Sequence, residues 1–167
     1  MKLFLLSIFF IASSCATHQP STAKIEISST LDKWHRAAAN ADFSSYFNLM
    51  TSDAIYIGTD ATENWNVQQF KAFAKPYFDR GKAWSFFAVQ RNIYVVDANL
   101  AYFDELLDTQ MKICRGSGIM KKIDNQWKVQ HYVLSMTVPN ENAAAVTAIK
   151  TPVEDALLKS LKPAPTK

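Results

Sequence analysis

The sequence has few of the residues that build nucleotide, metal or disulfide sites. Its 167 residues include only four glycines, and these form no glycine-rich loop of the kind that cradles phosphates. The histidines His18, His35 and His131 stand at no close spacing to carboxylates, so no metal site is predicted. No serine occupies the strand–turn–helix motif of hydrolases. We therefore predict no metal and no other cofactor.

The sequence also lacks a large excess of positive or negative charge. The net charge is +3, from 18 lysines and arginines against 15 acidic residues, and no basic patch stands out. A nucleic-acid partner is not predicted, because such proteins concentrate positive charge on one face. Aromatic residues, in contrast, are abundant, with eleven Phe, six Tyr and four Trp. They can fill the core of the single domain that this length allows.

The N-terminus has an apolar run that is too short to span a membrane. Lys2 precedes this run at residues 3–11, which is typical of a secretory signal. The following Ala-Ser-Ser-Cys resembles the lipobox of bacterial lipoproteins, which implies cleavage before Cys15 and acylation of its thiol. Ala16 then implies a cell-envelope protein anchored in the outer membrane and facing the periplasm. The alternative is a plain secretory signal with an incidental cysteine.

The remaining chain divides into three parts. We expect a small, polar tether at residues 16–23, a domain at residues 24–140 and a C-terminal tail at residues 141–167. With Cys15 modified, Cys114 is the one remaining cysteine, so no intramolecular disulfide is predicted.

The hydrophobic pattern predicts helices first and strands afterwards. Asp42 and Asn66 are suited to cap helices, and Gln69 completes a capping box with Asn66. Pro76 is expected to kink or end the helix that Asn66 begins. This order predicts an α+β domain with long antiparallel strands. The expected helices are 24–40, one starting after 42, one starting after 66, and 153–162; the expected strands are 54–58, 83–96, 100–108, 112–123 and 126–138, with a turn at 97–99.

The last strand has apolar residues at both odd-numbered and even-numbered positions. Strict alternation would place them on two faces: Tyr132, Leu134 and Met136 on one, Trp127, Val129 and Val133 on the other. A sheet that is dry on both faces needs a cover on each. A second copy of the chain is the simplest cover for the outer face, so we expect a homodimer.

Three stretches resemble one family. They are GTDATENW at 58–65, YFDELLD at 102–108 with CRGSG at 114–118, and QWKVQHYVLSMTVPN at 126–140. In this order they resemble the SnoaL-like branch of the nuclear transport factor 2-like superfamily. The resemblance implies a cone-shaped barrel, in which a curved antiparallel sheet wraps around N-terminal helices and leaves an open pocket, and it implies frequent dimers. It assigns no reaction, because the fold hosts isomerases, cyclases, dehydratases and binding modules.

Two adjacent carboxylates are the candidate catalytic residues. Asp104 and Glu105 lie in an apolar strand, so alternation sends one inward and one outward. An inward carboxylate must find a partner or take a raised pKa. Arg115, on the neighbouring strand, is the expected partner. The pair is either a structural ion pair or a site with a general base, and the sequence leaves both open.

Candidate ligand-binding residues come from a polar loop and from two tyrosines that could donate hydrogen bonds. His35 is expected to be a solvent-facing or satisfied side chain rather than a base. The candidates are Thr59, Asp60, Glu63, Trp65, Arg115, Tyr132 and Tyr46.

These observations favour a lipid-anchored envelope protein whose domain binds a small, mostly apolar molecule. One alternative is an isomerase or cyclase, with Asp104 or Glu105 as general base and Tyr132 or Tyr46 as hydrogen-bond donor. Another is a structural or accessory envelope lipoprotein whose tail helix docks on a partner.

Overall fold

The computed structural model describes residues 22–162. The predicted signal, the acylation site at Cys15 and nearly all of the tether lie outside these residues. Within the described part of the chain, no helix is both long enough and apolar enough to cross a bilayer.

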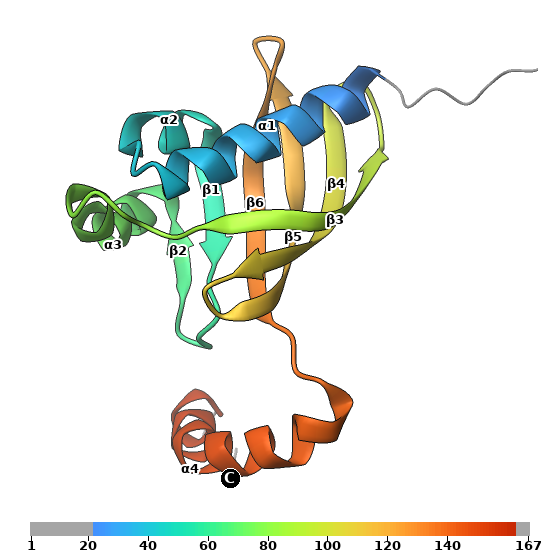
Figure 1. Cartoon of the computed structure of the whole chain (residues 1–167). Helices are drawn as coiled ribbons and strands as arrows, with labels where there is room; N and C mark the ends of the chain where they lie inside the picture. Colours follow the sequence, from blue (N-terminus) through green and yellow to red (C-terminus); the bar gives the residue numbers. More distant parts are fainter. Residues whose placement is uncertain (1–21, 163–167) are drawn as a thin grey trace, which may run out of the picture.

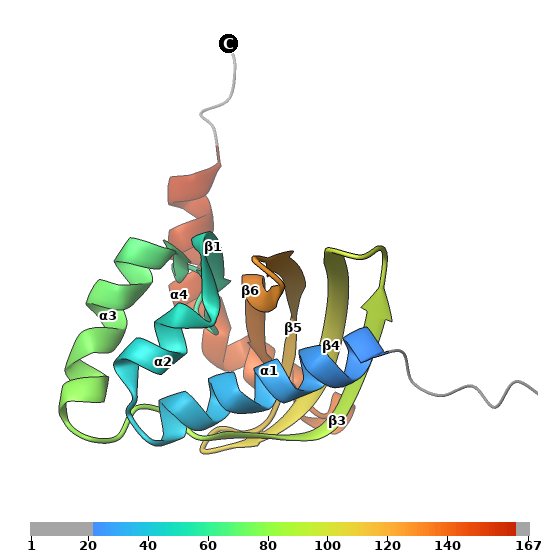
Figure 2. The same ribbon diagram turned by 90° about the horizontal axis from the view of Figure 1, so that it is seen from above.

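The first helix, α1 (Thr22–Ala39), is confirmed close to its predicted bounds. Its buried face includes Ile27, Leu31, Trp34 and Ala38, which recur every three or four residues. This face packs against the inner side of a curved sheet, and α1 runs across the sheet's concave side (Figures 1 and 2). The helix therefore forms the centre of the core.

Two further helices follow the predicted caps. The short α2 (Phe43–Asn48) begins at Asp42, whose side chain accepts a hydrogen bond from the Ser45 amide. Helix α3 (Val67–Asp79) begins at Asn66 with the expected capping box. Both helices lie beside one edge of the sheet (Figure 2).

Pro76 does not end α3, which continues for three more residues to Asp79. A proline within a helix removes one backbone hydrogen bond. Because it lies in the last turn, only a short segment has to continue beyond it. Gly81, with φ of 76°, then provides the left-handed conformation that ends many helices.

Six strands form one sheet in the order β2-β1-β6-β5-β4-β3. All neighbours are antiparallel except β1 and β6, which are parallel, a pairing that the sequence did not predict. The α+β class and the curved sheet around N-terminal helices are confirmed, although the sheet stays open between β2 and β3 (Figure 1). The strands are β1 (Met50–Ile57), β2 (Asn64–Asn66), β3 (Phe86–Val95), β4 (Leu100–Thr109), β5 (Lys112–Ile123) and β6 (Gln126–Met136).

A β-bulge in β6 changes the predicted faces of this strand. The register against β5 shifts between His131 and Val129, so one extra residue reverses the alternation. As a result Trp127, Val129, Tyr132 and Leu134 are all buried. The expectation that the first two lie on the opposite face from the last two was wrong, and the apolar pattern of β6 is no argument for a dry outer face.

The outer face of the sheet still exposes apolar side chains. Tyr94 of β3 and Tyr102 of β4 stack there with ring centroids 4.8 Å apart. Ile113 and Ile119 of β5 are also exposed. This face is therefore suited to a contact with another protein surface.

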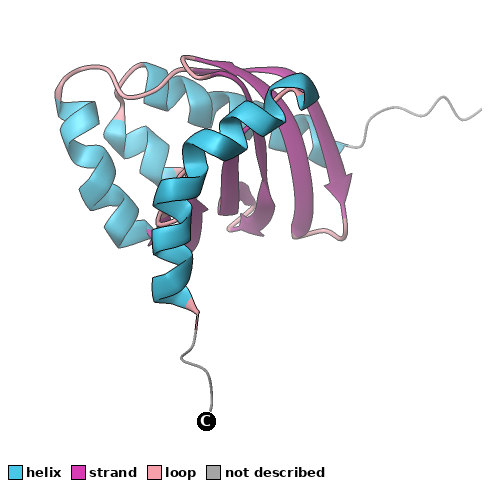
Figure 3. Cartoon of the chain, turned by 90° about the horizontal axis from the view of Figure 1, so that it is seen from below, coloured by secondary structure: helices cyan, strands magenta, loops and turns pink. Residues whose placement is uncertain are grey.

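The tail forms a longer helix than expected. After a short 3-10 turn (Asn140–Asn142), α4 spans Ala143–Leu161 instead of residues 153–162. None of its residues is buried, and the helix stands away from the sheet (Figure 1). Seen from below, it lies in front of the rest of the domain (Figure 3). The apolar residues Val153, Leu158 and Leu161 are exposed on it.

Candidate functional site

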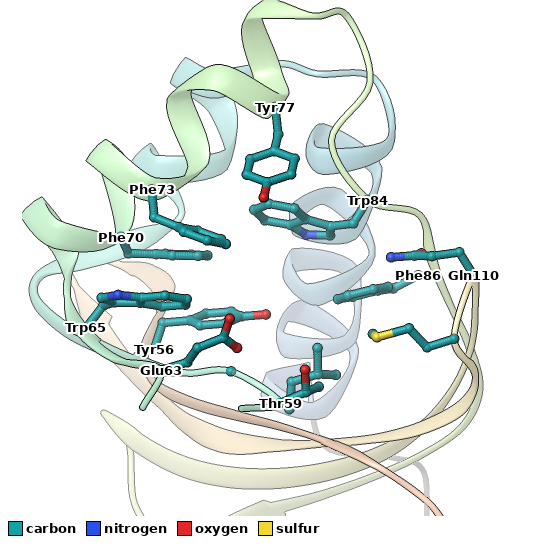
Figure 4. Close-up of a pocket in the computed structure, with 13 residues that line it drawn as sticks. Tyr56, Thr59, Glu63, Trp65, Phe70, Phe73, Tyr77, Trp84, Phe86 and Gln110 are labelled. Carbon is teal, nitrogen blue, oxygen red and sulfur yellow. The ribbon is translucent and has the colours of Figure 1, made fainter. Parts of the chain in front are cut away.

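A cavity of about 280 Å³ lies between α3, the β1–β2 loop and the β4–β5 turn. Figure 4 shows its aromatic walls, with few polar groups among them. The lining residues are Tyr56, Gly58, Thr59, Glu63, Trp65, Phe70, Phe73, Tyr77, Trp84, Phe86, Gln110, Met111 and Leu134.

Helix α3 supplies one wall. Phe70, Phe73 and Tyr77 follow one another at helical spacing, so their rings share one face of the helix. Phe70 is buried, whereas Phe73 is 37% and Tyr77 is 36% exposed. The outer two rings therefore border open space, where a small molecule can contact them.

The rings near the base of the cavity are stacked. Tyr56 lies parallel to Phe70, with centroids 4.0 Å apart, and Trp65 stacks on Phe73 at 4.3 Å. Trp84 also stacks with Phe70, with centroids 5.8 Å apart. Stacked rings hold one another in place, so the cavity is preformed.

Among the described residues, Glu63 is the one charged side chain in the lining. Its carboxylate points into the cavity (Figure 4), and its Oε2 accepts a hydrogen bond of 3.2 Å from the Asp60 amide. Gly58 lies directly beneath it, because a Cβ at that position would stand 2.1 Å from Glu63 Oε2. A glycine is therefore needed for the carboxylate to take this position.

A second inward carboxylate, Glu105 of β4, is fully enclosed. Its Oε1 accepts hydrogen bonds from His35 Nε2 at 2.7 Å and from the Tyr132 hydroxyl at 3.1 Å, and its Oε2 accepts one from Arg91 Nε at 2.8 Å. Glu105 is 1% exposed. Arg91 also donates to Asp32 of α1, so the cluster ties β3 and β4 to the central helix.

The predicted partner of this carboxylate was wrong. Arg91 of β3 pairs with Glu105, whereas Arg115 is exposed on the outer face. In the β4–β5 register Arg115 stands opposite Leu106, and Gly116 stands opposite Glu105. Residues directly opposite each other share a face, so Arg115 cannot reach the inner side.

Alternation separates Asp104 from Glu105, as expected. Asp104 points to the other face of the sheet, where its Oδ1 accepts a hydrogen bond of 3.0 Å from Asn92 Nδ2. Neither carboxylate lines the aromatic cavity.

The surroundings fix the charge of the Glu105 cluster. Burial alone would raise the pKa of Glu105, but the hydrogen bond from His35 and the positive charges of His35 and Arg91 outweigh it, so its pKa lies below the usual 4.5. Burial, with the Glu105 charge next, raises the pKa of Tyr132 well above its usual value. At neutral pH the cluster thus has an ionised Glu105 and a protonated phenol, which is a stable structural arrangement.

The ligand-binding candidates fall into two groups. Thr59, Glu63 and Trp65 line the cavity, and Asp60 lies in the same loop, where it accepts hydrogen bonds from the Thr62 amide and hydroxyl. Tyr46, Tyr132 and Arg115 lie elsewhere. Tyr46 is buried in the core and stacks on Trp34, with centroids 4.9 Å apart.

Most of the aromatic wall was not recognised from the sequence. The helical spacing of Phe70, Phe73 and Tyr77 predicts a buried helix face, but the spacing alone does not show that part of this face borders a cavity. Trp84, Phe86 and Met111 gave no local signal, because the turns that bring them together are far apart in the chain. Within residues 22–162 no group of three or more His, Cys, Asp or Glu side chains could hold a metal ion.

Comparisons with known proteins agree with this architecture. A family model described as a SnoaL-like domain matches residues 27–139. An NTF2-like protein from Pseudomonas putida is similar in structure, with a TM-score of 0.61 at 16% identity, over 74% of this chain and 92% of that one. No curated protein matches the sequence.

Two other solved structures have the same fold with different descriptions. A putative dehydratase of the NTF2-like family from Streptomyces avermitilis matches with a TM-score of 0.62 at 11% identity, over 72% of this chain and all of that one. The association domain of CaMKII from C. elegans matches with a TM-score of 0.58 at 17% identity, over 68% and 95%. At such identities the matches show the fold alone. The family model covers well over half of the chain, so the chain belongs to the SnoaL-like family, and its fold is the one shared by these NTF2-like structures.

Proposed function

We propose that this domain binds a small, mostly apolar molecule in its aromatic cavity. The observation that carries the proposal is the contrast in packing around Phe70. Its buried side is part of the core, while its neighbours Phe73 and Tyr77 border an open cavity of about 280 Å³. Apolar clefts with a few polar groups are the usual binding sites for small molecules. The size of the cavity limits the ligand to about one ring system.

Ligand binding can be tested by closing the cavity. Thr59 is an exposed lining residue, so Thr59→Phe places a ring in the cavity without changing the core. Ser52→Phe, on an exposed position of β1 away from the cavity, is the matched control. We expect tert-butylbenzene to change the tryptophan fluorescence of the wild type and of Ser52→Phe, because Trp65 and Trp84 line the cavity. Binding that survives in Thr59→Phe would contradict the proposal.

An isomerase or cyclase has less support. Glu105, the inward member of the predicted pair, already accepts three hydrogen bonds and has no surface on the cavity. A general base must reach the proton that it abstracts, either directly or through one water. The enzyme alternative would therefore need another base, and Glu63 is the carboxylate that lies within the cavity.

We also propose that the chain is acylated at Cys15 and held at the envelope, on the lipobox resemblance alone. Intact mass spectrometry of the protein from a bacterial membrane fraction tests this. Loss of the lipid mass in Cys15→Ser is the expected result, and an unmodified Cys15 in the mature wild type would contradict it.

A homodimer is supported by the apolar outer face of the sheet. The stacked Tyr94 and Tyr102, together with Ile113 and Ile119, would be covered by a second copy. Native mass spectrometry should give a dimer for the wild type and a monomer for Tyr102→Glu. The exposed residues Val153, Leu158 and Leu161 of α4 form a separate apolar surface. A structural or accessory role, in which this helix docks on a partner, therefore stays an alternative.

A further inference from the structure

Glu63 has a charge that the described part of the protein does not balance. Within residues 22–162, no lysine, arginine or histidine lines the cavity, and none forms an ion pair with this carboxylate. One of its oxygens accepts the hydrogen bond from the Asp60 amide, and the other has no hydrogen-bond partner among the described residues. A carboxylate can accept about four hydrogen bonds. A half-buried anion with an unused oxygen is a site for a positively charged or donating group.

The walls around Glu63 are also suited to a cation. Tyr56, Trp65, Tyr77 and Trp84 are electron-rich rings of the same cavity, and the faces of such rings attract cations. Tyr77 already shows this behaviour, because the Arg80 guanidinium lies 4.7 Å from the centre of its ring. Figure 4 shows the Glu63 carboxylate among the aromatic side chains.

The carboxylate is held in this position by the fold. The β1–β2 loop closes on itself through the hydrogen bond from the Gly58 amide to the Glu63 carbonyl, at 2.9 Å. Gly58 leaves the space that Glu63 Oε2 occupies. Burial, and after it the charge of Glu63, raises the pKa of the neighbouring Tyr56 above its usual value, so the phenol stays neutral and does not add a second negative charge.

We propose that the cavity selects a small organic cation, an ammonium group carried on an apolar or aromatic body, and that Glu63 is its counter-charge. The body would contact the rings of α3 and β3, and the ammonium group would lie between Glu63 and the aromatic faces. The inference deepens the proposed function and depends on it, because it names the chemical class of the ligand.

A pair of probes with the same shape separates charge from hydrophobicity. Phenyltrimethylammonium has a positively charged nitrogen where the neutral tert-butylbenzene has a carbon, and the two molecules otherwise have the same shape. Their binding to the full-length protein can be followed by tryptophan fluorescence. In Glu63→Gln we expect the Kd of phenyltrimethylammonium to rise about tenfold, because a charge–charge contact and its support of the cation–π contacts are lost. The Kd of tert-butylbenzene should not rise. The glutamine keeps an acceptor for the Asp60 amide, so the loop is retained.

Two further variants make the result specific. Gly58→Ala keeps the charge of Glu63 but pushes its carboxylate aside, so it should raise the Kd of phenyltrimethylammonium more than the Kd of tert-butylbenzene. Glu141→Gln removes the same charge from an exposed position away from the cavity and should change neither affinity. If Glu141→Gln raised the Kd of phenyltrimethylammonium as much as Glu63→Gln, the effect would come from the net charge of the protein, and the inference would be wrong.

The remaining outcomes distinguish the two proposals. Suppose that the wild type binds both probes, and that Glu63→Gln either leaves both affinities unchanged or lowers both equally. The cavity then binds small molecules without selecting cations, and only the inference fails. If the wild type binds neither probe, the proposed function fails and the inference fails with it.

Discussion

Glu105 and Glu63 both point into the interior of this domain, but they are satisfied to different degrees. Glu105 is 1% exposed and accepts hydrogen bonds from His35, Arg91 and Tyr132. Glu63 is half-buried and accepts one from the Asp60 amide. A buried carboxylate with donors on both of its oxygens stabilises the fold, whereas one with an open oxygen in a cavity is available to a ligand. The number of internal partners therefore separates a structural carboxylate from a functional one here.

The largest expected effect comes from removing the partner of Glu105. Arg91→Met would leave a buried carboxylate without its guanidinium, which costs about 3–5 kcal/mol of unfolding free energy. Arg115→Met is the matched control on the outer face and should change stability by less than about 0.5 kcal/mol. Urea denaturation of both variants measures this difference. Equal losses would show that the cluster has no special structural role.

A smaller effect is expected from crowding the same cluster. A Cβ at Gly116 would stand 2.2 Å from the Tyr132 hydroxyl oxygen and 3.0 Å from Glu105 Cγ. Gly116→Ala should therefore cost about 1–3 kcal/mol, as for other overpacked cores. In a Tyr132→Phe background the cost should fall, because the hydroxyl that collides is gone. If the losses of unfolding free energy from Gly116→Ala and Tyr132→Phe were additive in the double variant, the strain would not come from the Tyr132 hydroxyl.

The pH dependence of stability should report the ionisation of Glu105. Because the pKa of Glu105 is lower in the folded protein than its usual 4.5, its contribution is complete above that value and is lost as the pH falls through the folded pKa. The stability difference between wild type and Glu105→Gln should therefore shrink below about pH 4.5. Thermal unfolding across the acid range measures it. A difference that stays constant there would contradict the lowered pKa.

The sequence predicted the elements of the fold better than the partners within it. Helical spacing and caps placed α1, α2 and the start of α3, since these depend on neighbouring residues. Alternation showed that one of Asp104 and Glu105 must point inward. It could not show which one, because the side of a strand that faces the core depends on what covers each face of the sheet.

The error over Arg115 has a simple physical cause. Strand β4 has two neighbours, and the partner of Glu105 comes from β3 and not from β5. Counting outward from the predicted turn at 97–99 pairs Val95 with Ala101 and so Arg91 with Glu105, as the structure shows. The register of a hairpin was therefore available from the sequence. The bulge in β6 was not, because no residue type in the strand requires it.

The smallest expected effect concerns the stability of the Glu63→Gln variant. Since Glu63 is half-buried and keeps its hydrogen bond from the Asp60 amide as a glutamine, the unfolding free energy should change by less than about 0.5 kcal/mol. Glu105→Gln, measured in the same denaturation series, should lose more, because the amide cannot balance the buried charge of Arg91. If Glu63→Gln were as costly, Glu63 would be structural too, and its unused oxygen would no longer indicate a ligand. A near-zero cost combined with a loss of cation binding would show that this carboxylate is retained for its ligand.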